Sequence, residues 1–150
     1  PAALLVPMIA LVQLKQLFFD RPLVQKALDK GARKVLSRFG ALVRQRARWS
    51  IRKRQRASPP GQPPSSHTGL LRRYLFYAYE DARKSVIIGP AKLHAKKSSA
   101  PEILEYGGTT LLEIGKDKKK IQIAARAYMN PAFEKVKTQL PHLWRNSITH

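Results

Sequence analysis

The chain has 150 residues, of which 43% are hydrophobic, so it is long enough to form one domain with a core of its own. Its 29 lysines and arginines stand against nine aspartates and glutamates, and the net charge of +20 indicates an anionic partner: nucleic acid, an acidic protein surface or a membrane. The chain contains no cysteine, which excludes a disulfide scaffold, a zinc site built on cysteines and a cysteine nucleophile.

Residues 1–20 form an apolar segment ahead of the single domain that we expect over residues 21–150. A membrane-spanning helix needs about 20 apolar residues, but Pro7, Gln13 and Lys15 interrupt this run. No basic region precedes the run, so a signal peptide is not expected. We expect the segment to be buried or to face a partner, and a membrane role is the alternative.

The hydrophobic pattern predicts a long amphipathic helix from residue 22 to about residue 50, roughly 40 Å in length at 1.5 Å per residue. Apolar residues recur at steps of three, four and seven and form one stripe: Val24, Leu28, Val35, Phe39, Leu42 and Trp49. Basic residues occupy the opposite side: Lys26, Lys30, Arg33, Arg44 and Arg48. Asp20 is expected to cap this helix, with Pro22 in its first turn.

The end of this helix and the residues after it carry seven basic residues and no acidic one: Arg44, Arg46, Arg48, Arg52, Lys53, Arg54 and Arg56. Exposed basic side chains neutralise phosphates whatever the base sequence, and arginine is also a common anchor at protein interfaces. We therefore predict that this run contacts DNA or another protein. Arg46 falls on the apolar stripe, so either the core ends before it or it meets a carboxylate or a partner.

A proline-rich connector follows at residues 58–68 and contains four prolines: Pro59, Pro60, Pro63 and Pro64. Prolines cannot continue a helix and favour extended or turn backbone, so we expect a semi-rigid loop that projects from the domain. His67, Thr68 and Gly69 are expected to form the turn that re-enters the domain, in which Gly69 relaxes the backbone and Thr68 caps the next turn. A plain solvent loop or flexible linker is the alternative.

Short elements follow the connector. The stretch LRRYLFYAYED predicts a helical turn that passes into a strand, and KSVIIG predicts a second strand after a turn at residues 80–83. Residues 91–100 are polar and basic and are expected to form a loop. Pro101 can open a short helix that Gly107 and Gly108 stop.

The C-terminal third predicts a hairpin and a helix. The segments TTLLEIG and KKIQIAA are expected to pair as a hairpin, and Asn130 is expected to cap a final helix with Pro131 at its first position. The whole pattern predicts an α+β fold with a long N-terminal basic amphipathic helix, a small antiparallel sheet of about four strands and a C-terminal helix.

Aromatic residues cluster in the first of the expected strands. In an extended strand Tyr74 and Phe76 would share one face, and Tyr77 and Tyr79 would share the other. Such rings can form a platform on which bases stack, but the simpler expectation is that one of the two faces belongs to the core.

Motifs of catalysis are missing: the sequence has no phosphate-binding glycine loop, no dinucleotide-binding fingerprint and no zinc-protease helix. The four histidines are scattered without metal-ligand spacing: His67, His94, His142 and His150. Glu102 and Glu105 can share a helix face, and paired carboxylates can act in acid–base catalysis. Solvent-exposed or intersubunit salt bridges are the simpler expectation for these two residues. We therefore expect no enzyme activity, no catalytic residue, no metal, no cofactor and no small-molecule substrate.

Four stretches occur in an order that resembles a known family. They are ARKVLSRFGALVRQRARWSIRKR, then GQPPSSHTGLLRRYLFYAYED with SVIIGP, then PEILEYGGT, and last ARAYMNPAFEKVKTQLPHLWRNSI. Over residues 32–148 the chain resembles the small neck proteins of tailed bacteriophages, which are also labelled minor tail, tail-completion or virion morphogenesis proteins. Two features depart from the family: Ala127 and Tyr128 stand where it often has Pro-Phe, and the apolar segment at residues 1–20 has no counterpart.

The resemblance implies a subunit of a ring of six or twelve copies, made in the host cytoplasm and located in the neck or tail of the virion. Its partners would be the head connector or adaptor, the tail terminator or other tail proteins, and the genomic double-stranded DNA in the channel. The basic run would face DNA or a neighbouring subunit, and the proline-rich connector would be a docking arm. Two further groups correspond to family motifs: Glu105, Tyr106, Gly107 and Gly108 at a turn or interface, and Arg126, Tyr128, Asn130 and Pro131 at the start of the C-terminal helix.

Two other functions fit the same composition. A stand-alone nucleic-acid-binding protein would use the basic helix as its contact and the connector as a linker. A membrane-surface protein would use residues 1–19 together with the basic helix, and this is the less favoured of the two.

Overall fold

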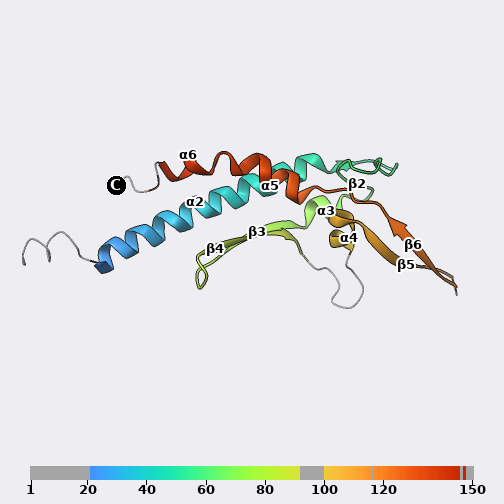
Figure 1. Cartoon of the computed structure of the whole chain (residues 1–150), viewed down its shortest axis with the longest axis horizontal. Coiled ribbons are helices and arrows are strands. Elements are labelled where there is room, and N and C mark those ends of the chain that lie inside the picture. The colour runs from blue at the N-terminus through green and yellow to red at the C-terminus, as the bar shows by residue number, and fades with distance from the viewer. Residues whose placement is uncertain (1–20, 92–99, 116, 146, 148–150) are drawn as a thin grey trace, which may run out of the picture.

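The computed structural model describes residues 21–91, 100–115, 117–145 and 147. The apolar segment at residues 1–20, the proposed Asp20 cap and nearly all of the loop expected at residues 91–100 lie outside the described residues. The described chain is elongated and combines a long N-terminal helix, short antiparallel ribbons and helices near the C-terminus (Figure 1). This architecture confirms the predicted α+β class.

The elements follow one another as α2 (Arg21–Ser50), β1 (Arg52–Lys53), β2 (Ser65–Ser66), α3 (Leu70–Arg73), β3 (Leu75–Glu80), β4 (Ser85–Pro90), α4 (Ala100–Tyr106), β5 (Gly108–Ile114), β6 (Asp117–Ile123), α5 (Met129–Lys137) and α6 (Leu140–Arg145). The helices and the four longer strands lie where the sequence predicts them. The short parallel pair of β1 and β2 was not predicted.

The predicted long helix is present as α2, but its buried face is shorter than expected. The buried residues recur mostly at steps of three and four: Gly31, Val35, Phe39, Gly40, Val43 and Ala47. Val24 and Leu28 are exposed because the elements described around α2 do not cover its first turns (Figure 1). Trp49 is also exposed, since it lies about 200° around the helix from Ala47.

Beside the short pair of β1 and β2, the four longer strands form two separate antiparallel ribbons, so the expectation of one antiparallel sheet is wrong. β3 pairs with β4 from Leu75 opposite Pro90 to Glu80 opposite Ser85. β5 pairs with β6 from Gly108 opposite Ile123 to Ile114 opposite Asp117. Each ribbon is closed by its own local turn, and the second extends from α4 at the opposite end of the molecule from the first turns of α2 (Figure 1).

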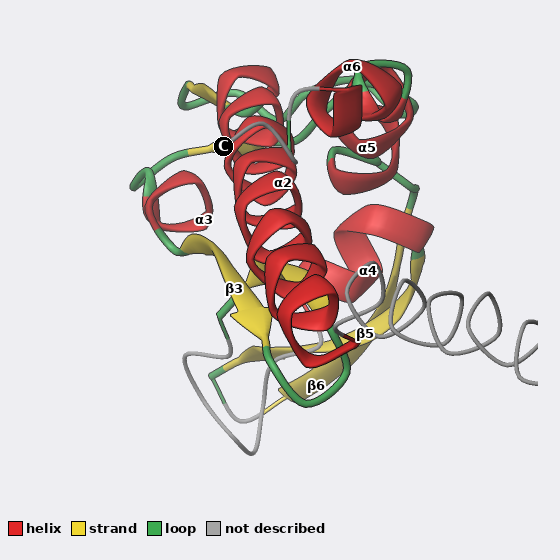
Figure 2. Cartoon of the chain, turned by 90° about the vertical axis from the view of Figure 1, so that its left-hand side faces the viewer, coloured by secondary structure: helices red, strands yellow, loops and turns green. Residues whose placement is uncertain are grey.

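The core lies where α2 meets α5 and the start of β3. It consists of Phe39, Val43, Ala47, Ile51, Leu75, Tyr128, Ala132 and Val136. Figure 2 shows α2 between the pair α5 and α6 on one side and β3 on another. The ring of Phe133 meets that of Phe39 edge to face at 5.7 Å, a favourable aromatic geometry that joins α5 to α2.

The ribbon of β3 and β4 lies very close to α2 because residue 40 is a glycine. A Cβ atom at Gly40 would lie 2.7 Å from a Val86 methyl carbon and 3.0 Å from a ring carbon of Tyr77. On the same face of β3, the guanidinium of Arg33 lies 5.7 Å from the ring centre of Tyr79. The face that carries Tyr77 and Tyr79 therefore packs against α2, but neither ring is among the buried core residues, and Tyr77 keeps 39% of its surface exposed. Leu75 is the residue of this face that belongs to the core, so the expectation that one aromatic face belongs to the core is met only in part.

Candidate interaction surface

The proline-rich connector is folded against the domain at several points. β1 and β2 align Arg52 with Ser65, so the two ends of the connector lie side by side. The Gly61 N–H donates to the Ala125 carbonyl at 3.0 Å. The Arg126 Nε donates to the Ser58 carbonyl at 2.9 Å. These bonds tie both the start and the middle of the connector to the segment that leads from β6 to α5.

The expectation of a loop that projects freely is therefore wrong for part of the connector. Pro64 is fully buried, and Ser58 is buried as well. A buried backbone carbonyl needs a hydrogen-bond partner, and the Ser58 carbonyl finds one only by folding back onto Arg126. Pro59 and Pro60 stay exposed and Pro63 is half-buried, so the tip of the connector and its last two residues, His67 and Thr68, are available to a partner.

The turn after the connector has the expected form. Gly69 has a φ of 79°, in the left-handed region that favours glycine. The Leu70 N–H donates to the Thr68 hydroxyl oxygen over a long 3.4 Å. His67 and Thr68 are both exposed beside the turn. The predicted re-entry of the chain at Gly69 is confirmed.

Arg44 differs from the other residues of the basic run because the domain itself uses it. It is half-buried, its Nε donates to the Leu75 carbonyl, and its guanidinium lies 6.0 Å from the ring centre of Phe76. Arg44 thus ties α2 to the start of β3. Arg48 is also half-buried, so neither residue is fully available to an external partner.

The remaining five members of the basic run are exposed, and we call them the basic turn: Arg46, Arg52, Lys53, Arg54 and Arg56. None of them forms an ion pair with any residue that the structure describes. Like charges that are close together and unpaired repel one another, so an anion that binds here relieves this repulsion. The sequence identified these residues, but it did not separate them from Arg44.

Glu105 is a structural residue that caps α5 from another helix. Its carboxylate accepts the backbone N–H groups of Tyr128 at 2.9 Å, of Met129 at 3.0 Å and of Asn130 at 2.8 Å. The expectation that Asn130 caps this helix is wrong, because Asn130 lies in the first turn and donates to the cap. Pro131 is the third residue of α5, whereas the sequence predicts it as the first. It has no N–H to donate, so the first turn still accommodates it.

The two motifs around Glu105 and Arg126 meet in this cap region. Tyr128 is buried, and burial together with the nearby Glu105 carboxylate raises its pKa to about 12. The Arg126 N–H donates to the Leu104 carbonyl at 2.7 Å. A side chain at Gly107 would be strained, because its φ is 76° and a Cβ would lie only 3.0 Å from the Ala125 backbone nitrogen. Of these motif residues, Tyr106 is strongly exposed, at 77%, and Gly108 is exposed.

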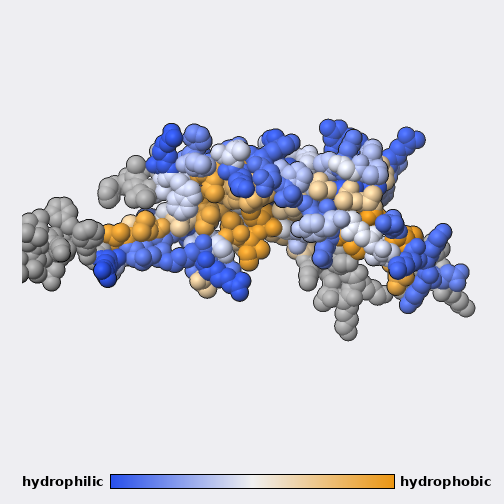
Figure 3. All heavy atoms as spheres, viewed as in Figure 1, coloured by the Kyte–Doolittle hydropathy of each residue, from blue (hydrophilic) through white to orange (hydrophobic). Residues whose placement is uncertain are grey.

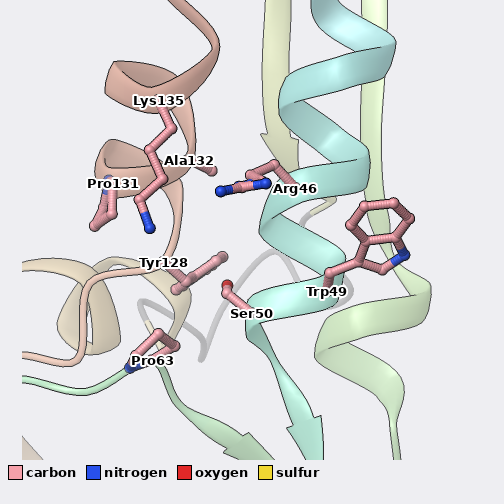
Figure 4. Close-up of a pocket in the computed structure, with 8 residues that line it drawn as sticks. All are labelled: Arg46, Trp49, Ser50, Pro63, Tyr128, Pro131, Ala132 and Lys135. Atoms are coloured by element: carbon pink, nitrogen blue, oxygen red, sulfur yellow. The ribbon is translucent and has the colours of Figure 1, made fainter.

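A groove lies between α2 and α5, made of two adjoining depressions of about 260 Å³ and 280 Å³. Arg46, Trp49 and Lys135 line both depressions. Figure 4 shows the side chains of Arg46 and Lys135 extending into the space between the two helices, with Tyr128 and Ser50 beneath them. We call this feature the α2–α5 groove. Lys135 was not among the residues that the sequence singled out.

Large apolar side chains are exposed at both ends of the elongated molecule (Figure 3). At one end Leu23, Val24 and Leu28 project from the first turns of α2. At the other end Tyr106 is the last residue of α4, and Leu111 lies on β5 with 62% of its surface exposed. Such surfaces are typical of subunits that assemble with other proteins.

Among the described residues, no three histidine, aspartate or glutamate side chains gather as a metal site. In the same part of the chain, no helix has the length and apolar character needed to cross a membrane. Comparison with family models, with curated proteins and with solved structures found no match to this chain.

Proposed function

We propose that this chain is a structural virion protein of a tailed bacteriophage. In this proposal it is a ring-forming subunit of the neck, which joins the DNA-filled head connector to the tail and completes the tail. Its partners are further copies of itself, six or twelve in the ring, the head connector or adaptor, and tail proteins. Genomic double-stranded DNA passes through the ring. The proposal includes no enzymatic activity and no cofactor.

The observation that carries the proposal is the exposure of different apolar surfaces at opposite ends of the molecule. Val24 and Leu28 lie at one end, and Tyr106 and Leu111 at the other. Two different surfaces that meet head to tail generate a heterologous contact, and such contacts close into a ring when the rotation permits. Burial of each large side chain contributes about 1.5–3 kcal/mol, which offsets part of the cost of association and of the repulsion between two basic subunits.

The basic turn supports a place beside DNA. A ring repeats the exposed cations Arg52, Lys53, Arg54 and Arg56 in every subunit, around a polyanion that has to move through the channel. Contacts to phosphates from arginine and lysine carry no base specificity, which suits a subunit that must let any sequence pass. Arg44 is excluded from this role because it is bonded to Leu75.

A stand-alone nucleic-acid-binding protein is the second candidate, and the unpaired basic turn favours it. The dependence of DNA affinity on salt distinguishes the two. A dedicated binder holds duplex DNA at physiological ionic strength, with a steep slope that reflects many phosphate contacts. A neck subunit binds duplex DNA weakly as an isolated protein and needs its partner rings to assemble.

Electron microscopy of phage particles made with and without this chain tests the proposal. If it is right, loss of the chain gives filled heads and separate tails, or heads that leak DNA. Mass measurement of the complex with its partner rings then gives the number of copies. Complete, stable particles in the absence of the chain would contradict the neck function and leave DNA binding as the function to test.

A further inference from the structure

The α2–α5 groove combines two unpaired cations with an apolar lining. Arg46 and Lys135 are exposed, and neither forms an ion pair with a described residue. Both extend into the space between α2 and α5 in Figure 4. Around them the groove is lined by the apolar side chains Leu42, Pro131 and Ala132 and by the polar side chains Gln45, Ser50 and Gln139. Trp49 also borders the groove and is 63% exposed, but in Figure 4 its ring lies on the side of α2 away from α5.

This composition fits a protein segment better than a nucleic acid. A DNA duplex keeps its bases stacked inside and presents mainly its polar phosphates, which gain nothing from an apolar wall. A peptide that carries a carboxylate beside an apolar side chain satisfies both parts of the groove: the carboxylate pairs with the cations, and the apolar side chain displaces water from the wall. The groove lies between two helices, where apolar peptides are commonly bound.

The chain itself offers few carboxylates to fill this groove. Five of its nine acidic residues are already engaged: Asp29 with Lys84, Asp81 with Arg33, Glu80 with Arg83, Glu134 with Lys137, and Glu105 with the start of α5. Since the chain is so strongly basic, a second copy would bring mainly repulsion to the groove. Charge complementarity therefore favours an acidic partner of a different kind.

We propose that the α2–α5 groove binds a short acidic and apolar segment of a different protein. Arg46 and Lys135 hold a carboxylate of that segment, and the apolar wall formed by Leu42, Pro131 and Ala132 receives an adjacent apolar side chain. Arg46 is thus assigned to a protein partner, whereas Arg52, Lys53, Arg54 and Arg56 are left to DNA. The inference rests on the groove alone, and it holds whether or not the partner belongs to a virion.

The test uses the full chain with Trp144→Phe, which leaves Trp49 as the only tryptophan and its fluorescence as the readout. The probes are a short synthetic peptide of glutamate, leucine and serine, a counterpart with glutamine for glutamate, another with lysine for glutamate, and a short DNA duplex. The test variant combines Arg46→Glu with Lys135→Glu. The control combines Lys34→Glu with Arg38→Glu, two exposed residues of α2 outside the groove, and makes the same change in net charge.

We expect the glutamate peptide to bind the parent chain and the control, and to bind the Arg46/Lys135 variant at least about tenfold more weakly. The glutamine peptide should bind weakly throughout, and the lysine peptide should bind the test variant best. Such a reversal of preference cannot come from unfolding, and a melting curve measured by circular dichroism checks the fold independently.

Three results would overturn the inference. The first is failure of the glutamate peptide to bind the parent chain at about 1 mM, or an equal loss of glutamate-peptide binding in the test and control variants. The second is a selective loss of duplex binding in the test variant, which would make the groove a phosphate site. The third is a change of oligomeric state confined to the test variant in sedimentation, which would place a second copy in the groove. None of these results depends on whether particles need the chain, so failure here and failure of the neck function are distinguishable.

Discussion

The carboxylate of Glu105, near the end of α4, accepts the backbone N–H of Tyr128, just before α5, at 2.9 Å. With two further bonds, from Met129 and Asn130, this one side chain satisfies three N–H groups that a helix start leaves without partners. No acidic residue of α5 itself lies in its first turn. Glu105 also brings negative charge to the positive end of the helix dipole. The α4 helix is therefore part of the stability of α5.

Replacement of Glu105 by alanine is expected to destabilise the fold by about 2–3 kcal/mol, because it leaves N–H groups of α5 without partners. Glu105→Gln keeps one acceptor oxygen without the charge and should fall between alanine and the wild type. Glu102→Ala on the same helix is the control, since Glu102 is exposed, and it should change stability by less than about 0.5 kcal/mol. Urea denaturation followed by circular dichroism measures all three, and equal effects at positions 102 and 105 would contradict the capping role.

The buried Tyr128 predicts a loss of stability at alkaline pH. Its pKa is raised from 10.0 to about 12, first by burial and then by the Glu105 carboxylate. Between about pH 10 and pH 12 the folded chain therefore keeps this proton, whereas the unfolded chain loses it. The stability that the protonated Tyr128 contributes is fully present below pH 10 and is lost as the pH rises toward 12. Tyr128→Phe should reduce the fall in the urea midpoint over this range, whereas Tyr106→Phe, at an exposed ring, should not. Parallel curves for wild type and Tyr128→Phe would contradict this assignment.

Elements with a local signal could be predicted from the sequence. Three local signals predict the positions of elements to within a few residues: the apolar spacing of α2, the turns of the two hairpins, and the proline near the start of α5. What could not be predicted depends on residues far apart in the chain. The Glu105 carboxylate accepts the N–H of Asn130, which lies 25 positions further along the chain. Arg126 donates to the Ser58 carbonyl, which lies 68 positions before it. No periodicity or propensity encodes such a partner.

The same limit applies to the candidate surface. Composition alone identified the basic run, but the separation of Arg44 from Arg46 depends on where the Leu75 carbonyl lies. Lys135 joins Arg46 only because α5 packs against α2. The proline-rich connector has the expected rigid composition, yet its position is decided by two hydrogen bonds to the residues before α5.

Gly40 predicts a close packing of α2 on the first ribbon. Alanine normally favours a helix over glycine by about 1 kcal/mol, but its Cβ at this position would lie 2.7 Å from Val86. Gly40→Ala is therefore expected to lower stability by about 1–3 kcal/mol. The double variant Gly40→Ala with Val86→Ala should recover part of this loss in thermal unfolding. Gly89→Ala is the control, because a Cβ there meets nothing within 4 Å, and a loss at both glycines alike would contradict the packing argument.

Arg44 and Arg54 should behave differently although both belong to the basic run. Arg44→Ala leaves the Leu75 carbonyl without its donor and is expected to cost about 1–3 kcal/mol. Arg54→Ala removes an exposed side chain and should leave stability within about 0.5 kcal/mol. For DNA binding we expect the opposite: Arg54→Ala has the larger effect and reduces the slope of log affinity against log salt by about one, while Arg44→Ala leaves this slope unchanged. Thermal melting and fluorescence anisotropy with a short duplex make the two comparisons.

The connector predicts that its prolines divide into two groups. Pro64 is fully buried, so Pro64→Ser should lower the melting temperature, at a cost of about 1–3 kcal/mol. Pro59 and Pro60 are exposed at the tip, so replacing both by serine should leave the melting temperature nearly unchanged. If the tip docks on a neighbouring protein, the double variant should nevertheless assemble less well, because a stiff segment loses less entropy on docking than a flexible one.

The yield of complete particles from each variant, measured by electron microscopy, tests whether the tip contributes to assembly. Normal assembly by the Pro59 and Pro60 variant would restrict the connector to a role inside the fold, where the Gly61 bond to Ala125 already holds it.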